Sequence, residues 1–148
     1  MAFRFPLEVL LRVRRGLERQ HELRLQEANH AVAVLRQQIE NVHREAENIV
    51  ARRWPQFKSG VSAAELQFDV LCQLALTERQ RILEKQLHEA EALRQTRSQE
   101  FLHARRQREV IDTLRQHQLK EYEIQESRLD QRRLDDLFLL RRAYLRRG

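Results

Sequence analysis

The stretch Trp54-Pro55-Gln56-Phe57-Lys58-Ser59-Gly60-Val61-Ser62 is the only interior place in the sequence where proline and glycine occur together. A chain reversal needs residues of this kind. Pro55 disfavours the helical conformation for Trp54, and Gly60 tolerates a positive φ. The stretch therefore predicts one sharp turn over residues 54–61, and the long segments on either side carry few other turn signals.

The composition of those flanking segments favours helices. Charged residues make up 34% of the chain and aromatic residues only 6%, and Leu, Arg, Glu, Gln and Ala dominate. These are strong helix formers, and their combined excess is typical of coiled coils. We expect an all-α protein, an antiparallel two-helix coiled-coil hairpin whose second helix is the longer. It should form one domain over residues 1–148, with helices at about 6–53 and 62–146.

A regular apolar stripe marks the contact face of the first helix. Its steps alternate between four and three residues, which is the spacing of a left-handed coiled coil. The stripe consists of Ala28, Val32, Leu35, Ile39, Val42, Ala46 and Ile49. A second stripe, Leu10, Val13 and Leu17, has a different phase, so we expect a local irregularity near residues 16–24.

The second helix should begin at a capping box formed by Ser62 and Glu65. A turn centred within residues 54–61 would place Ile49 near Leu66, Val32 near Leu83 and Leu10 near Ala104. The first helix would then end opposite about position 108, and the second would continue alone. Apolar residues are dense again in this overhang, and such exposed stripes usually mark an interaction site.

The sequence lacks the motifs of the common catalytic and metal sites. It contains no glycine-rich phosphate loop, and no two of its six histidines are three or four residues apart. Cys72 is the only cysteine, so the chain cannot form an intramolecular disulfide, and a reducing compartment fits. We expect its small side chain to be half-buried and not to act as a nucleophile. The N-terminus is a poor signal peptide, and no apolar run is long enough to span a membrane. We expect no enzyme activity and no cofactor.

Three segments stand out as candidate contact surfaces. The first is the N-terminal segment of residues 1–14, whose alternative interpretation is a frayed end with a hydrophobic staple. The second lies early in the second helix, where apolar residues exceed what one narrow seam can hide; alternatively, they pack on Trp54 and Phe57 of the turn. The third is the C-terminal Arg128-Leu129-Asp130-Gln131-Arg132-Arg133-Leu134-Asp135-Asp136-Leu137-Phe138, whose alternative is a self-dimerising helix.

The first and third segments resemble the two ends of the FliJ family, a component of the flagellar export apparatus of bacterial type III secretion. The Phe-Arg-Phe-Pro-Leu opening followed by Leu-Leu-Arg-x-Arg is similar to the family's N-terminus. The run from Arg128 to Asp136 is similar to its C-terminal signature, and the length and single turn also agree.

The resemblance implies a coiled-coil stalk similar to the γ subunit of rotary ATP synthases. The implied partners are the hexameric flagellar export ATPase, the cytoplasmic part of the membrane-embedded export gate and export chaperones. The implied location is cytoplasmic, peripherally associated with the inner membrane through the export apparatus. The implied gate contact is Phe68, Leu71, Ala75 and Glu78. The implied ATPase contact is Arg128, Asp130, Gln131, Arg132, Arg133, Leu134, Asp135, Leu137 and Phe138.

Two other functions stay open from the residues. One is the equivalent stalk of a virulence type III secretion system, which shares the helical core. The other is a basic coiled coil that binds nucleic acid, favoured by the net charge of +6 and by the cluster Arg105-Arg106-Gln107-Arg108. Interspersed acidic residues and the lack of an aromatic platform argue against the second, so we expect no nucleic-acid partner.

Overall fold

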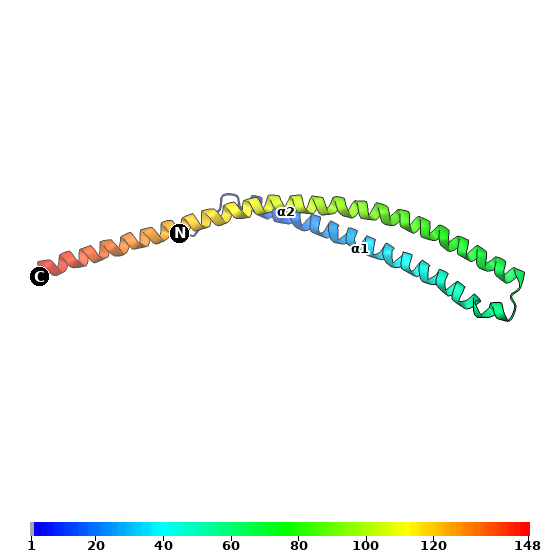
Figure 1. Ribbon diagram of the computed structural model, residues 1–148. Helices are drawn as coiled ribbons and strands as arrows, with labels where there is room; N and C mark the ends of the chain where they lie inside the picture. The colour runs from blue at the N-terminus through cyan, green and yellow to red at the C-terminus, as the bar shows by residue number, and fades with distance from the viewer. Residues whose placement is uncertain (1) are drawn as a thin grey trace. The chain divides into compact units, whose positions relative to one another are not determined.

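The computed structural model describes residues 2–148, so Met1, the first residue of the expected domain, lies outside it. The described chain is an all-α helical hairpin, as predicted (Figure 1). Helix α1 spans Glu8–Arg53, a short 3-10 helix spans Pro55–Lys58, and helix α2 spans Ala63–Arg147. No strand occurs among residues 2–148, and the second helix is the longer one.

The starts of both helices follow from local hydrogen bonding. In α1, the amide of Glu8 donates to the carbonyl of Phe5 at 3.2 Å, two residues after the expected start at Pro6. In α2, the amide of Glu65 donates to the hydroxyl of Ser62 at 3.2 Å, and the amide of Ser62 donates to the Glu65 carboxylate at 3.4 Å. This is the predicted capping box, which satisfies two amides that have no partner inside the helix.

The reversal differs from the prediction in one respect. Trp54 is helical, with φ −53° and ψ −46°, so the expected exclusion of Trp54 from this conformation is wrong. Pro55 occupies the start of the 3-10 helix, a position where a proline ring fits and its missing N–H costs nothing. The chain turns only afterwards, at Gly60, whose φ of 89° is a conformation that other residues rarely adopt.

The hairpin divides into two compact units, which are described separately. The turn unit consists of Gln20–Leu102 and contains the reversal. The terminal unit consists of residues 2–19 together with His103–Gly148. In each unit a segment of α1 packs antiparallel against a segment of α2.

The turn unit has the predicted seam. Every residue of the apolar stripe from Ala28 to Ile49 is buried or half-buried, which confirms the contact face of α1. On α2, however, Leu66 is exposed although it was expected to face Ile49, and Val70 is exposed as well. The residues that face inward instead are Asp69, Gln73, Leu76, Gln80, Leu83, Leu87 and Ala90. Their steps alternate between four and three residues, whereas Leu66, Val70 and Leu74 are four apart and drift off the seam.

The terminal unit reverses the expected faces of α1. Leu11 is fully buried, and Arg14 and Glu18 are half-buried, whereas Leu10, Val13 and Leu17 are exposed. The inward positions therefore continue from Leu11 to Ile49 in alternating steps of three and four, and the expected irregularity near residues 16–24 is wrong. A search for apolar spacing missed this because the seam here is charged.

Ionic and polar partners across the helices explain why charged residues can occupy the seam. The guanidinium of Arg108 donates to the carboxylate of Glu18 at 2.6 and 3.1 Å. Arg14 donates to the amide oxygen of Gln107 at 2.6 Å. Half-buried charges are tolerated when they are paired and hydrogen-bonded in this way.

An apolar cluster closes the N-terminal end of the terminal unit. Phe5, Leu11 and Ile111 are buried together, and Phe3 packs against them. The ring of Phe3 lies 5.6 Å from that of Tyr122, and the guanidinium of Arg115 lies 6.0 Å from the centre of the Phe3 ring. The N-terminal segment is therefore packed rather than frayed, and α2 has a partner as far as Tyr122 instead of ending its pairing near position 108.

The observed register is shifted relative to the expected one. Arg53 pairs with Asp69, Gln73 donates to the carbonyl of Ala46 at 3.2 Å, and Leu11 shares a cluster with Ile111. The expected pairs Ile49–Leu66 and Leu10–Ala104 are wrong by about one heptad. The physical reason is the 3-10 helix, which adds residues to the first side of the hairpin before Gly60 reverses the chain.

We predict that cysteine crosslinking reports this register. In a Cys72→Ser background, the pair Leu11→Cys with Ile111→Cys should form a disulfide under mild oxidation, because both side chains lie in one buried cluster. The pair Leu10→Cys with Ala104→Cys is the matched control and should stay reduced. Electrophoresis without reducing agent measures both. Efficient crosslinking of the control pair alone would contradict the register.

Ion pairs also make the hairpin sensitive to acid. The hydrogen bond from Arg108, assisted by the charge of Arg15, lowers the pKa of the Asp112 carboxyl, and the hydrogen bond from Arg53 lowers that of Asp69. A carboxyl whose pKa is lower in the folded than in the unfolded chain stabilises the fold above its unfolded value of about 3.9. That contribution disappears as the pH falls through the lowered pKa.

We therefore predict that Asp112→Asn lowers the melting temperature at pH 7 and that the difference from the unchanged protein shrinks as the pH falls from about 4 to 2. Thermal unfolding followed by circular dichroism measures both proteins. A difference that stays constant from pH 7 to pH 2 would show that the Asp112 ion pairs do not stabilise the hairpin.

Candidate interaction surfaces

The residues expected to contact the export gate lie along one exposed side of α2 in the turn unit. Phe68 is 64% exposed and Leu71 is 58% exposed. Ala75 and Glu78 are also exposed, and the spacing of the four residues places them in a stripe along the helix. Glu78 accepts hydrogen bonds from Arg81, which lower the pKa of the Glu78 carboxyl and keep it charged.

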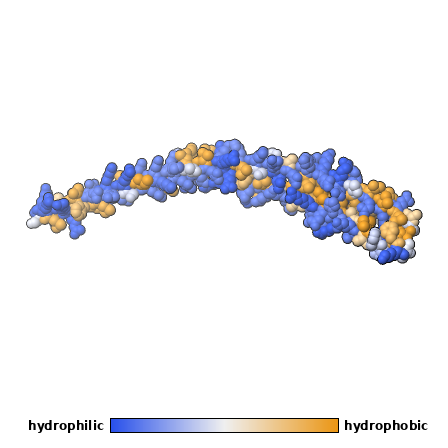
Figure 2. Space-filling model, in the orientation of Figure 1, coloured by the Kyte–Doolittle hydropathy of each residue, from blue (hydrophilic) through white to orange (hydrophobic). Residues whose placement is uncertain are grey.

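The alternative, in which the apolar residues of this segment pack on Trp54 and Phe57, applies to Leu66, Val70 and Leu74, which line one groove with the two rings. Trp54 is 72% exposed, and Phe57 is exposed as well. These two rings border a groove on another side of the turn unit. Its volume is about 600 Å³, and its apolar lining consists of Ile49, Val50, Trp54, Phe57, Leu66, Val70 and Leu74. Figure 2 shows hydrophobic surface gathered at this end of the hairpin.

Sequence reasoning missed this groove as a surface. The available signal was the four-residue spacing of Leu66, Val70 and Leu74, which leaves the seam within two turns. Arg53 and Asp69 form its polar floor, where a second contact of their ion pair joins Nη2 to Oδ1 at 3.2 Å. The hydrogen bond to Asp69 raises the pKa of Arg53, so this pair stays fully charged at neutral pH.

A second groove of the turn unit includes one of the predicted contact residues. Ala75 lines it together with Cys72, Leu76, Ile49 and Arg52. Cys72 is a half-buried free thiol, as predicted from the sequence. The stripe from Phe68 to Glu78 therefore borders an apolar hollow, although the hollow is open to solvent on its outer side.

The C-terminal segment of α2 is a helix without a covering partner among the described residues. Every residue from 127 to 148 is exposed, and this includes all the residues expected to contact the ATPase. Leu134, Leu137 and Phe138 are more than half exposed. Arg133 donates to Asp130 at 3.4 Å, a short-range pair on the same helix. We call residues 127–148 the tail.

Four apolar residues of the tail lie on a different side of α2 from the seam. Continuing the seam beyond Tyr122 leads to Gln125, Leu129, Arg132, Asp136 and Leu139, of which two are apolar. Leu134, Leu137, Phe138 and Leu145 instead share the opposite side at helical spacing. The tail therefore presents its own apolar face, flanked by charges of both signs.

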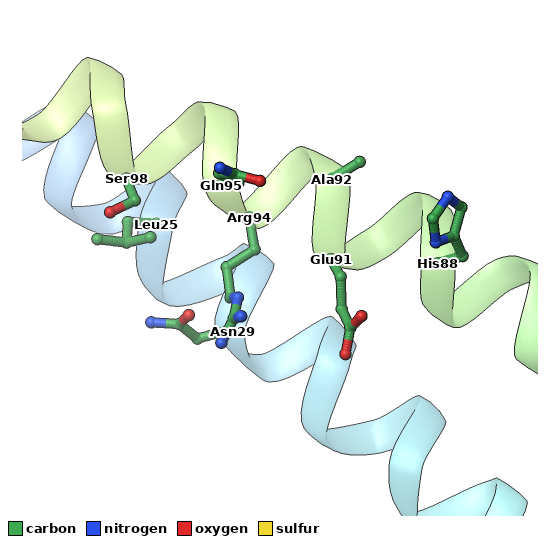
Figure 3. A pocket seen from close by; sticks show the side chains of 8 residues that line it. All are labelled: Leu25, Asn29, His88, Glu91, Ala92, Arg94, Gln95 and Ser98. Carbon is green, nitrogen blue, oxygen red and sulfur yellow. The ribbon is translucent and has the colours of Figure 1, made fainter.

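A polar groove occupies the middle of the turn unit. It has a volume of about 540 Å³ and is lined by Leu25, Asn29, His88, Glu91, Ala92, Arg94, Gln95 and Ser98. Arg94 extends from α2 toward Asn29 of α1 (Figure 3). Nearby, Arg36 and Glu91 form an ion pair at 2.9 Å on the surface. The groove is open and polar, unlike the water-excluded sites that strongly perturb catalytic groups.

Metal binding and membrane insertion find no support in the part of the chain that the structure describes. No group of three or more His, Cys, Asp or Glu side chains among residues 2–148 is arranged to hold a metal ion. None of the described helices has an apolar stretch long and uncharged enough to cross a membrane.

These observations define the class of the protein: an α-helical coiled-coil hairpin with exposed apolar stripes and a helical tail that no other described segment covers. The chain belongs to the flagellar FliJ protein family, whose model matches residues 3–148. It is thus a protein related to flagellar export and type III secretion, in a family of non-catalytic export components. Comparison with curated proteins and with solved structures produced no match.

Proposed function

We propose that the chain is the non-enzymatic central stalk of the flagellar export apparatus, which binds and stimulates the hexameric export ATPase. The observation that carries this proposal is the tail, where α2 runs on past its last contact with the N-terminal segment and exposes every residue from 127 to 148. An isolated helix in water is only marginally stable, so an apolar helix without a partner is suited to binding one.

The chemistry of the tail suits a ring of equivalent subunits. Leu134, Leu137 and Phe138 supply an apolar anchor, and such residues carry most of the binding energy in protein interfaces. Arg128, Arg132 and Arg133 supply positive charge that steers and orients binding to carboxylates. Contacts of moderate strength let one tail bind each of six chemically equivalent sites reversibly.

The remaining parts of the proposal concern the other partners. The stripe from Phe68 to Glu78 contacts the cytoplasmic domain of the export gate and so holds the protein at the inner membrane through the export apparatus. The protein also escorts export chaperones. Membership of the flagellar FliJ family favours this system over the virulence counterpart.

Binding to nucleic acid is disfavoured by the ion pairs of the basic cluster. Arg105 pairs with Glu109 at 3.0 Å, and Arg108 pairs with both Glu18 and Asp112. Two of the three arginines in this cluster are therefore already neutralised by carboxylates. Phosphate contacts require cations that are available to replace counterions.

We predict that Leu134→Asp combined with Phe138→Ala abolishes stimulation of the export ATPase and leaves the hairpin folded. Both side chains are exposed, so the free energy of unfolding should change by no more than about 0.5 kcal/mol. Phosphate release by the ATPase is measured with and without the variant. Ile82→Asp combined with Leu93→Ala, two exposed apolar positions elsewhere on α2, is the control. Full stimulation by the tail variant would refute the placement.

We predict that Phe68→Ser combined with Leu71→Ser weakens binding to the cytoplasmic domain of the export gate without reducing ATPase stimulation. The loss should be at least about tenfold, because two apolar anchors are removed from one face. Calorimetric titration measures the affinity. Leu74→Ser is the matched control, since Leu74 is equally exposed and lines the groove on another side of the same helix. Unchanged affinity of the double variant would rule this stripe out as the contact.

A further inference from the structure

The two flanks of the seam in the terminal unit differ in chemistry. In an antiparallel coiled coil, the positions that border the seam on one side of each helix face their equivalents on the other helix. On one flank these positions hold ion pairs: Arg15 pairs with Asp112 at 3.2 Å, and Glu8 pairs with the seam residue Arg115 at 3.1 Å. The exposed surface of this flank is therefore occupied by paired charged side chains.

The other flank is apolar. Its bordering positions hold Leu10 and Leu17 on α1 and Gln107 and Leu114 on α2. The next positions outward hold Val13 and Val110, which are 53% and 70% exposed. The hydrogen bond from Arg14 to Gln107 lies on the same side and joins the two helices beneath this surface. We call Leu10, Val13, Leu17, Val110 and Leu114 the apolar flank.

The apolar flank is a surface made by both helices, and it is distinct from the faces of α1 and α2 that lie in the seam. In a chain with 34% charged residues, five exposed apolar side chains without a charge among them are not a typical solvated surface. Gly16 lies at its outer edge, and outside the backbone of α1 itself there is open space around the position that a Cβ atom would occupy. A glycine inside a helix costs about 1 kcal/mol relative to alanine, and it lets another helix approach closely.

The borders of the apolar flank are positively charged. Arg106 and Lys120 lie beyond it on α2, and both are exposed. Arg14 differs from Arg15, Arg108 and Arg115 because its acceptor is the neutral Gln107, and its Nε is buried without any acceptor. Glu121 is the one carboxylate at a bordering position, one heptad beyond Leu114. The excess charge around the surface is thus positive.

We propose that the apolar flank is a docking face for an amphipathic α-helix with acidic flanks, presented by a partner protein. The apolar side of that helix packs over the apolar flank, and its carboxylates meet Arg14, Arg106 and Lys120. A second copy of this chain fits poorly, because it would bring two sets of the same positive charges together. The site is separate from the tail and from the stripe at Phe68, so it adds a third surface to those proposed above.

Two synthetic peptides of three to four helical turns test this proposal on the full-length protein. Both carry the same leucine face and a fluorescent label; one has glutamates and the other lysines on its flanks. Fluorescence anisotropy at physiological salt should show the glutamate peptide binding at least about tenfold more tightly than the lysine peptide. Equal affinity for the two peptides, or no binding of the glutamate peptide, would overturn the proposal.

Variants locate the binding. Val13→Glu combined with Val110→Glu should weaken binding of the glutamate peptide at least about tenfold. Leu102→Glu in the turn unit, and the tail variant Leu134→Asp with Phe138→Ala, should leave it unchanged. Arg106→Glu combined with Lys120→Glu should shift the preference toward the lysine peptide, and it keeps the apolar residues intact. Unchanged binding by the valine variant would refute the site.

Sedimentation of the unchanged protein distinguishes the alternative occupant. The proposal predicts that Val13→Glu has no effect on its oligomeric state. A dimer that this substitution dissociates would assign the apolar flank to a second copy of the chain and overturn the proposal.

Discussion

The fold depends on a seam whose inward positions alternate between steps of three and four residues. On α1 this alternation is unbroken from Leu11 to Ile49, and on α2 it is unbroken from Asp69 to Tyr122. A left-handed coiled coil needs this spacing, because it keeps the same face of each helix on its partner. The spacing is kept even where the residues are charged. Arg14, Glu18 and Arg108 occupy seam positions of the terminal unit and are held there by hydrogen bonds.

This constraint also determines which surfaces remain for other molecules. Because the seam needs only one narrow face of each helix, any further apolar residue is left exposed. Exposed apolar residues outside the seam form three surfaces: the groove near Trp54, the stripe from Phe68 to Leu71 and the apolar flank. The tail arises differently, since α2 is simply longer than its partner segment. Together these surfaces are the exposed apolar regions on which the proposed contacts with other proteins rest.

The sequence predicted the fold well because the turn signals were few. Pro55, Gly60 and the capping box of Ser62 and Glu65 occur only once, and the stripe from Ala28 to Ile49 has regular spacing. The register was wrong because the 3-10 helix before Gly60 depends on how Trp54 and Pro55 pack, which spacing does not reveal. The inward face of residues 10–18 was wrong because apolar spacing marks any amphipathic face, whether it is the seam or a surface.

The sequence identified candidate contact residues, but it did not show which side of each helix they occupy. Phe68, Leu71 and the tail residues were chosen through the family resemblance, and the structure leaves each of them accessible. The apolar flank could not be found beforehand, because it required knowing that Leu11 rather than Leu10 faces α2. The difference in charge between the two flanks is visible only in the observed register, in which Arg15 pairs with Asp112.

Amide hydrogen exchange on the isolated protein tests the central claim, that the seam ends at Tyr122 and leaves the tail without a partner. Amides of residues 11–49 and 69–122 should exchange slowly, because their opening requires separation of the helices. Amides of residues 127–148 should exchange much faster, since a lone helix frays readily. Equal protection along the whole of α2 would mean that the tail is covered in the isolated protein and would contradict the account.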